Sequence, residues 1–270
     1  MNLTAEYDNR GRVAEHPAII ANWHRDAEAY RREARADIDL AYGAAPRNRY
    51  DVFHPARDSQ GPLVVFIHGG YWRSFDKSVF SHMAAGANRH GLDVAVPSYS
   101  LCPEVTVPDI IDELRQCCLH LHRTHGRQLV VTGHSAGGHL AACLAATDWT
   151  AYGAPSNLIK AGLSVSGVFD LRPLIVTPHN DDLRLTAASA LAASPLCWPM
   201  PKPCPFDLWV GADESAEFLR QSLSLSAAWT GLGVAAPYVE LAGKNHFTAP
   251  NGLADAASLL TRRLVDLSHA

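Results

Sequence analysis

A serine between two glycines, placed where an apolar run meets a helical pattern, constrains the fold of this chain most strongly. Residues 129–142 begin with the apolar run Leu-Val-Val, continue through Gly133, Ser135 and Gly137, and end in an alanine-rich stretch. This order predicts a buried strand, a tight turn and a helix, with the serine at the apex of the turn. A side chain at position 133 or 137 would press against the neighbouring strand and helix. We therefore expect a nucleophilic serine at the carboxyl edge of a sheet, beside a helix N-terminus.

The rest of the chain alternates between strand-like and helix-like patterns. Apolar or alternating runs predict strands at 50–55, 62–68, 93–99, 161–168, 206–210 and 237–241. Helical patterns fall between them at 78–90, 107–125, 183–193, 214–229 and 252–267. Such alternation is typical of a mostly parallel central sheet covered by helices on both faces. Together with the strand–turn–helix around Ser135, it predicts an α/β fold of the α/β-hydrolase type, with residues 1–270 in a single domain.

Two segments add to this plan. A helix is predicted over about 14–36, with Trp23 on its apolar face. We expect that tryptophan to pack against the domain, and a place at the mouth of the active site is the alternative. Residues from about 172 to 205 carry a cluster of prolines and form a stiff insert near the active site.

Bulk properties exclude several classes of function. The net charge of -4 leaves no basic surface for nucleic acid, and no apolar run is long enough to cross a bilayer. The six cysteines form no C-x-x-C pair, and the chain starts with no signal-peptide pattern, so we expect free thiols and a cytoplasmic protein. The histidines are scattered without zinc spacing, so no metal or cofactor is expected. A small-molecule substrate is the expected partner, and the surface helices leave room for a homodimer.

A serine hydroxyl needs a base to take its proton and an acid to orient that base. On α/β-hydrolase folds these groups follow in the order serine, acid, histidine. His246 stands directly after the last predicted strand and before the last predicted helix. It is therefore assigned as the base for Ser135.

The acid has several candidates. Glu214 lies three residues past Gly211, which ends the predicted strand 206–210, and we assign the role to it. The neighbouring Asp213 is the main alternative, and Asp170 after the preceding strand is a further one. Glu217 is expected to face outward from the first helical turn, where acidic residues are favoured.

The donors for the oxyanion are expected in the loop His68-Gly69-Gly70-Tyr71-Trp72, which follows a buried strand. Two glycines let the backbone turn and direct N–H groups at a reacting carbonyl. We assign the backbone N–H groups of Gly70, Tyr71 and Ala136 to this role. His68 is expected to be a structural hydrogen-bonding residue.

These segments resemble the kynurenine formamidase (arylformamidase) family of α/β-hydrolases. The loop matches that family's HGGxW pattern, and the likeness extends over GHSAGGHL at 133–140, SGVFDLRPL at 166–174, ESAEFLRQS at 214–222 and Tyr42-Gly43. Family members often carry aspartate at the position of Glu214, which supports that position as the acid. The resemblance implies hydrolysis of N-formyl-L-kynurenine to kynurenine and formate through a formyl-enzyme.

The substrate pocket is less constrained by the sequence. Trp72 and Phe169 are the predicted walls of an aromatic leaving-group pocket. A cation for the carboxylate of kynurenine is available in Arg73, Arg172 or Arg184. A carboxylesterase acting on short-chain acyl esters would use the same machinery and is the alternative function. A catalytically inactive hydrolase fold used for binding is a remote alternative.

Overall fold

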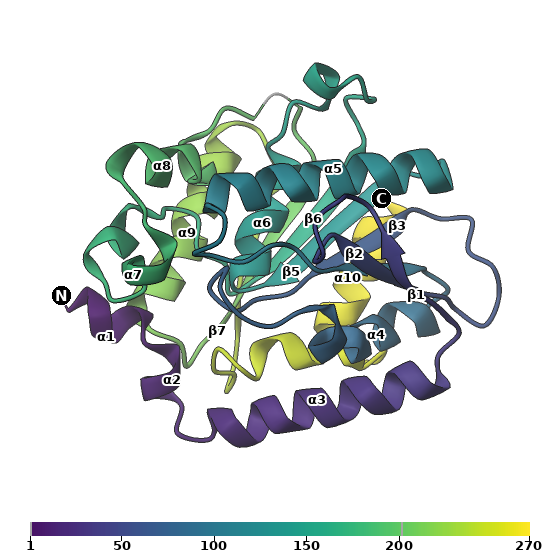
Figure 1. Cartoon of the computed structure of the whole chain (residues 1–270), viewed down its shortest axis with the longest axis horizontal. Helices are drawn as coiled ribbons and strands as arrows, with labels where there is room; N and C mark the ends of the chain where they lie inside the picture. The colour runs from purple at the N-terminus through teal and green to yellow at the C-terminus, as the bar shows by residue number, and fades with distance from the viewer. Residues whose placement is uncertain (1, 201) are drawn as a thin grey trace.

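A twisted eight-stranded sheet forms the centre of the computed structural model, which describes residues 2–200 and 202–270 (Figure 1). Its strand order is β1-β2-β4-β3-β5-β6-β7-β8. Strands β1 and β2 pair antiparallel, as do β2 and β4, and every other neighbouring pair is parallel. The predicted mostly parallel sheet is thus confirmed. The strands are β1 (Ala36–Ala41), β2 (Arg49–Phe53), β3 (Leu63–Ile67), β4 (Val94–Pro97), β5 (Leu129–His134), β6 (Ile159–Val165), β7 (Phe206–Gly211) and β8 (Tyr238–Leu241).

Helices cover both faces of this sheet. In Figure 1, α5, α6, α8 and α9 lie on one face, while α3, α4 and α10 lie on the other. The helices are α1 (Leu3–Tyr7), α2 (Asn9–Arg12), α3 (His16–Glu33), α4 (Ala85–Arg89), α5 (Val107–His125), α6 (Ala136–Ala145), α7 (Asn180–Leu183), α8 (Ala187–Ala192), α9 (Ala216–Gly231) and α10 (Leu259–His269). Short 3-10 helices connect them: η1 (Lys77–Ala84), η2 (Trp149–Tyr152), η3 (Arg172–Val176), η4 (Pro195–Cys197) and η5 (Ala249–Ala254).

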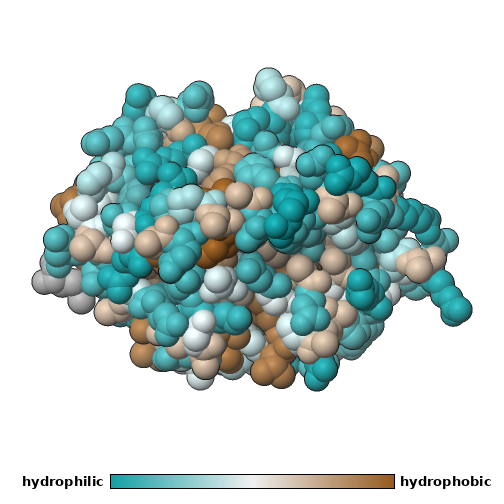
Figure 2. Space-filling model, turned by 90° about the horizontal axis from the view of Figure 1, so that it is seen from below, coloured by the Kyte–Doolittle hydropathy of each residue, from teal (hydrophilic) through white to brown (hydrophobic). Residues whose placement is uncertain are grey.

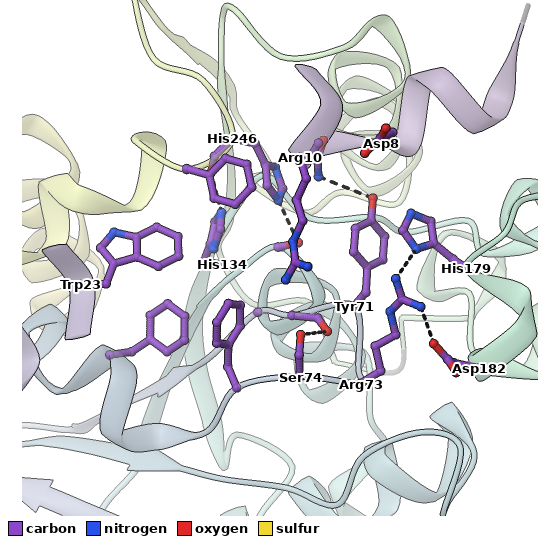
Figure 3. Close-up of a pocket in the computed structure, with 17 residues that line it drawn as sticks. Asp8, Arg10, Trp23, Tyr71, Arg73, Ser74, His134, His179, Asp182 and His246 are labelled. Carbon is purple, nitrogen blue, oxygen red and sulfur yellow. Dashed lines mark hydrogen bonds and ion pairs between the residues drawn. The ribbon is translucent and has the colours of Figure 1, made fainter. Parts of the chain in front are cut away.

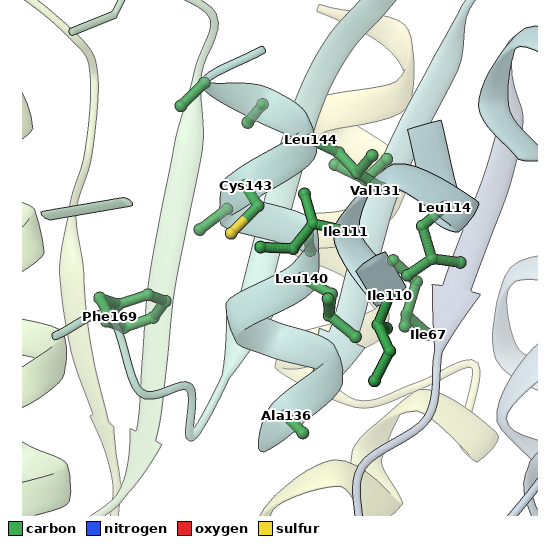
Figure 4. Close-up of a cluster of buried hydrophobic side chains, with 14 of the residues drawn as sticks. Ile67, Ile110, Ile111, Leu114, Val131, Ala136, Leu140, Cys143, Leu144 and Phe169 are labelled. Carbon is green, nitrogen blue, oxygen red and sulfur yellow. The ribbon is translucent and has the colours of Figure 1, made fainter. Parts of the chain in front are cut away.

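The central strands are apolar at every position because both of their faces are buried. In β3, Leu63, Val65 and Ile67 belong to one hydrophobic cluster. Val64 and Phe66, which point the other way, belong to the second cluster. Figure 4 shows the first cluster, in which aliphatic side chains of α5 and α6 meet those of β3 and β5. A continuous apolar run in the sequence therefore marks a strand sandwiched between two helical layers.

Several elements differ from the sequence-based expectation. The helix expected at 252–267 is the 3-10 helix η5 followed by α10, and the one expected at 183–193 is mostly the shorter α8. Strand β1 was not predicted, because this edge strand is largely exposed and lacks an apolar run. The helix expected at 78–90 is instead the 3-10 helix η1 followed by the short α4. The long helix α5 occupies the predicted range; a capping box of Thr106 and Asp109 starts it and Gly126, at φ +66°, ends it.

Exposed hydrophobic residues are dispersed over the surface. On the face shown in Figure 2 they occur in small groups separated by hydrophilic side chains. Among the residues that the structure describes, no helix has both the length and the hydrophobicity needed to span a membrane. The cysteines are all free in the structure.

Candidate active site

Ser135 occupies a sharp turn between β5 and α6, as its sequence pattern predicts. Its backbone angles of φ 58° and ψ -120° are strained for a residue with a side chain. The turn is crowded on both sides. A Cβ at Gly137 would lie 1.9 Å from the carbonyl oxygen of Ile67, and one at Gly133 would lie 2.4 Å from that of Gly137. Only glycine at both positions lets the strand and helix approach closely enough to hold the serine at the apex.

The structure brings Ser135, His246 and Glu214 into one chain of contacts. Nδ1 of His246 lies 2.6 Å from Oε2 of Glu214, and Nε2 lies 3.0 Å from Oγ of Ser135. A carboxylate can only accept hydrogen bonds, so Nδ1 carries the proton and donates to Glu214. The other nitrogen is then left with a lone pair for the serine hydroxyl. All three residues are buried, which strengthens their interactions relative to water.

Glu214, not its neighbour, contacts the histidine. Its side chain is fully buried, and its second oxygen, Oε1, accepts from the backbone N–H of Gly211 at 2.8 Å and from the hydroxyl of Ser166. These bonds hold the carboxylate in place. Asp213, one residue earlier, is exposed.

The other carboxylates considered from sequence have separate partners. Asp170 forms an ion pair with Arg172 at 2.8 Å. Burial acts to raise the pKa of Asp170, but the hydrogen bonds from Arg172 outweigh it and hold the pKa below its usual value. The expectation that Glu217 faces outward was wrong. This side chain is buried and binds Arg220 and the hydroxyl of Tyr7, because α1 packs over the start of α9.

The predicted oxyanion donors have free backbone N–H groups. In the described part of the chain, the N–H groups of Gly70, Tyr71 and Ala136 donate to no protein acceptor. The loop has an unusual backbone: φ is +114° at Gly70 and +49° at Tyr71. A Cβ at Gly70 would lie 2.3 Å from the carbonyl oxygen of Ser74. Glycine at this position is therefore required on both conformational and steric grounds.

His68 helps to hold this loop in position. Its ring stacks on Tyr99 with centroids 4.3 Å apart, and its Nδ1–H donates to the carbonyl of Gly69 at 2.8 Å. Burial lowers the pKa of His68 to about 4, so the ring is neutral at pH 7. The side chain acts on the position of the loop and does not reach the serine.

A cavity of about 330 Å³ opens directly above Ser135. Figure 3 shows Trp23 and His134 on one side of it, and the charged side chains of Arg73 and Asp182, with the rings of Tyr71 and His179, on the other. Trp23 contacts Phe80 and Phe247, and Phe80 contacts Phe75, so these four lining rings form one aromatic cluster. The charged lining residues are Asp8, Arg10, Arg73 and Asp182. In the residues described, no group of three or more histidine, cysteine or acidic side chains is arranged to hold a metal ion.

Trp72 and Phe169, predicted to bind the substrate, do not line this cavity, which corrects that expectation. Both side chains are fully buried in the first hydrophobic cluster. The indole of Trp72 packs inside this cluster, and its Nε1–H donates to Nδ1 of His139 at 3.2 Å. Proximity to the glycines in sequence was a poor guide to the direction of this side chain.

The lining residues reach the cavity through long-range packing. Trp23 on α3 is buried in the second hydrophobic cluster, as expected, and it also lines the cavity; its Nε1–H donates to Asn251 at 2.9 Å. Arg73 is the only one of the three candidate cations that lines the cavity, and Arg10 was not anticipated. Helix α2, which carries Arg10, has four residues and too short a pattern to detect. Phe247 could have been noticed, because it directly follows His246.

Comparison with known proteins agrees with this geometry. A family model described as BD-FAE matches residues 50–185, which include the glycine loop and the serine turn. A curated relative, kynurenine formamidase of Danio rerio, is 31% identical over 238 residues, covering 85% of this chain and 81% of that protein. This match covers more of the chain than the family model does.

Solved structures share the whole architecture. A crystal structure described as a proposed thioesterase of a Silicibacter species superposes with a TM-score of 0.90 at 34% identity and covers 98% of this chain and 99% of that one. An esterase of Pyrobaculum calidifontis superposes with a TM-score of 0.74 at 16% identity, covering 94% and 93%. The second likeness concerns the fold alone. The surroundings of Ser135 are thus those of an α/β-hydrolase.

Proposed function

The chain belongs to the kynurenine formamidase family of α/β-hydrolases, and from this premise we propose that it hydrolyses N-formyl-L-kynurenine to kynurenine and formate. In this proposal Ser135 is the nucleophile, His246 the general base and Glu214 the acid that orients it. The observation that carries the proposal is the contact chain between these three side chains, with distances of 3.0 and 2.6 Å. The free N–H groups of Gly70, Tyr71 and Ala136 would bind the oxyanion.

The first half-reaction is acylation of Ser135. Nε2 of His246 takes the hydroxyl proton while Oγ attacks the formyl carbon. Glu214 stabilises the imidazolium that forms, because its carboxylate faces Nδ1–H. Collapse of the tetrahedral intermediate breaks the C–N bond, and the imidazolium gives its proton to the departing aniline nitrogen. The products at this stage are kynurenine and a formyl ester on Ser135.

The second half-reaction removes the formyl group. A water molecule attacks the ester carbon, and His246 again takes the proton and then returns it to Oγ of Ser135. Formate leaves and the free enzyme is restored. A formyl group carries only a hydrogen on its carbonyl carbon, so it needs little space beside the oxyanion donors. The cavity volume is then free for the aromatic leaving group, which suits the rings of Trp23, Phe80 and Phe247.

A carboxylesterase acting on short-chain acyl esters is the second candidate function. It is favoured by the likeness at 34% identity to a structure described as a proposed thioesterase, an enzyme class that cleaves an activated acyl group. The same nucleophile, base and oxyanion donors serve both reactions. They differ in the leaving atom and in what the cavity must bind beyond it.

One assay separates these two functions. The purified protein is given N-formyl-L-kynurenine and, separately, p-nitrophenyl acetate, and kcat/KM is measured for each. We expect the formamide to be preferred, with kynurenine and formate released in equal amounts. A preference for the ester by orders of magnitude would replace formamidase with esterase. The Ser135→Ala variant, which lacks only the hydroxyl, serves as the control and should lose both activities.

We further propose that the enzyme works in the cytoplasm. Support comes from its six free cysteines, five of which are buried. Fractionation of the source cells with an antibody to the protein tests this location, and recovery in the membrane or secreted fraction would contradict it.

A further inference from the structure

The segment before α3 lies across the cavity and is fixed there by a buried tyrosine. The hydroxyl of Tyr7 donates to Glu217 at 2.8 Å and accepts from Nε2 of Gln221 at 2.9 Å. Its carbonyl oxygen accepts two further bonds, from the hydroxyl of Tyr71 at 2.6 Å and from Nε2–H of His179 at 3.1 Å. Four hydrogen bonds to Tyr7 therefore hold the segment in place three residues before Arg10.

The turn that follows is held by its own cap. The carboxylate of Asp8 accepts from the backbone N–H of Gly11 at 2.9 Å. A Cβ at Gly11 would lie 2.3 Å from that same carboxylate, so a larger residue there would displace the Asp8 side chain from its cap. Arg10 sits within this turn. Figure 3 shows its side chain directed into the cavity, between His246 and Tyr71 in that view.

The charged side chains that line the cavity are two acidic and two basic residues, and they are not all paired with one another. Arg73 pairs with Asp182 and also donates to Nδ1 of His179. The carboxylate of Asp8 caps α2 and in Figure 3 points away from the guanidinium of Arg10. Among the residues that the structure describes, no carboxylate forms an ion pair with Arg10. It is therefore the cation of the cavity that is still available to a ligand.

We propose that Arg10 binds the carboxylate on the leaving-group side of the substrate and so selects amino-acid-bearing aryl formamides. This inference rests on the proposed function and assigns its substrate class. A guanidinium matches a carboxylate with two parallel hydrogen bonds, and its charge is permanent at physiological pH. The aromatic ring would lie against Trp23, Phe80 and Phe247. The arginine touches the substrate at a distance from the reacting carbon, so it governs binding and leaves the chemical step alone.

The test compares two formamides that differ in the carboxylate. N-formyl-L-kynurenine carries it, and formanilide, the formamide of aniline, lacks it. In Arg10→Gln we expect KM for N-formyl-L-kynurenine to rise about tenfold to a hundredfold, with little change in kcat. The same variant should cleave formanilide with native kcat/KM. Arg10→Lys keeps the charge without the bidentate geometry, so its KM for N-formyl-L-kynurenine should lie between those of the native enzyme and Arg10→Gln.

Arg12 provides the matched control. It lies on the same short helix, is exposed and does not line the cavity, so Arg12→Gln should leave both substrates unaffected. Equal losses with both formamides in Arg10→Gln would mean a merely structural role and would overturn the proposal. Unchanged KM for N-formyl-L-kynurenine would overturn it as well.

Failure of the proposed function can be told apart from failure of this inference. If the native enzyme does not cleave N-formyl-L-kynurenine, the formamidase function falls. The carboxylate preference is then decided with two esters, phenyl acetate and 3-acetoxybenzoate, which differ by a carboxylate on the leaving ring. If Arg10→Gln lowers kcat/KM only for the carboxylate-bearing ester, the result supports the role of Arg10. Equal loss, or none, overturns it.

Discussion

Nδ1 of His246 contacts Oε2 of Glu214 at 2.6 Å, although the shorter Asp213 stands one residue before it. The difference arises from the turn that follows β7. There Oε1 of Glu214 accepts from the N–H of Gly211, so the chain folds back and places the longer side chain inward. The neighbouring aspartate is thereby left in solvent. The length of the glutamate matches the distance from this turn to the imidazole.

The two carboxylates should therefore differ in their effect on catalysis. In Glu214→Gln a neutral amide replaces the carboxylate that faces Nδ1, so the imidazolium loses its negatively charged partner. We expect kcat to fall by about 10³- to 10⁴-fold. Asp213→Asn should keep kcat within about twofold, since an exposed carboxylate interacts weakly with a buried site. Steady-state kinetics on the preferred substrate measures both. The reverse ranking would move the acid to Asp213.

Local pattern predicted most of the sheet because its central strands are buried on both faces. The run from Leu63 to Ile67 has no alternative to a core position. Edge strand β1 was missed for the opposite reason. Its side chains are mostly exposed, and its sequence Ala-Asp-Ile-Asp-Leu-Ala continues the charged composition of the preceding helix. Hydrophobic pattern carries information only where burial imposes it.

The residues of the candidate site likewise fall into those that the sequence predicted and those that it did not. Ser135, His246 and the glycine loop sit at fixed offsets from strands, so their chain order was sufficient to bring them together. The cavity wall depends on tertiary packing between α3, η1 and the final loop, which no spacing encodes. Trp72 was misplaced because its indole packs into the first hydrophobic cluster, and Arg10 was missed because α2 is a single turn.

The glycine loop gives a second prediction. Gly70→Ala places a Cβ 2.3 Å from the carbonyl oxygen of Ser74 at a φ of +114°, so the loop must shift and its N–H groups lose their aim. We expect kcat to fall at least about a hundredfold, the cost of losing one oxyanion donor. Labelling of Ser135 by an organophosphonate should slow in parallel, because that reaction uses the same donors.

Gly91→Ala is the matched control for backbone strain. Gly91 has a φ of +84°, and nothing lies within 4 Å of the Cβ position. This variant should lose about 1 kcal/mol of unfolding free energy and keep full activity. If it loses activity as Gly70→Ala does, global strain and not loop position would explain both results.

Tyr7 provides a third prediction, on the docking of the first residues. Tyr7→Phe removes the hydroxyl that contacts Glu217 and Gln221, at a cost of about 1–3 kcal/mol of docking free energy. Tryptic cleavage after Arg10 or Arg12 should then speed up about tenfold, since cleavage follows the population of the open segment. Tyr152→Phe, at an exposed site, should cleave at the native rate. A native rate in Tyr7→Phe would mean that the hydroxyl does not hold the segment.

His139 gives the last prediction, on stability and pH. The ring is fully buried: Nε2–H donates to the carbonyl of Ala193 at 2.7 Å, and Nδ1 accepts from the indole of Trp72 at 3.2 Å. Protonation would place an N–H at Nδ1 against the indole N–H. Burial lowers the pKa of His139 to about 4, whereas the pKa of a histidine in the unfolded chain is about 6.5. Between these values the unfolded chain binds more protons.

The stability contributed by a neutral His139 is therefore complete above about pH 6.5 and is lost progressively as the pH falls toward about 4. Urea unfolding of the native chain and of His139→Gln, at about pH 7 and about pH 4.5, measures this contribution. The variant will be less stable at neutral pH. Its unfolding free energy should fall less on acidification, by about 2–3 kcal/mol, because glutamine takes up no proton. Between about pH 7 and 8 the unfolding free energies of the two proteins should change with pH in the same way, because His139 is mostly neutral in both the folded and the unfolded chain there. An equal decline in both would mean that His139 is protonated in the folded chain and that its bond from Trp72 does not hold it neutral.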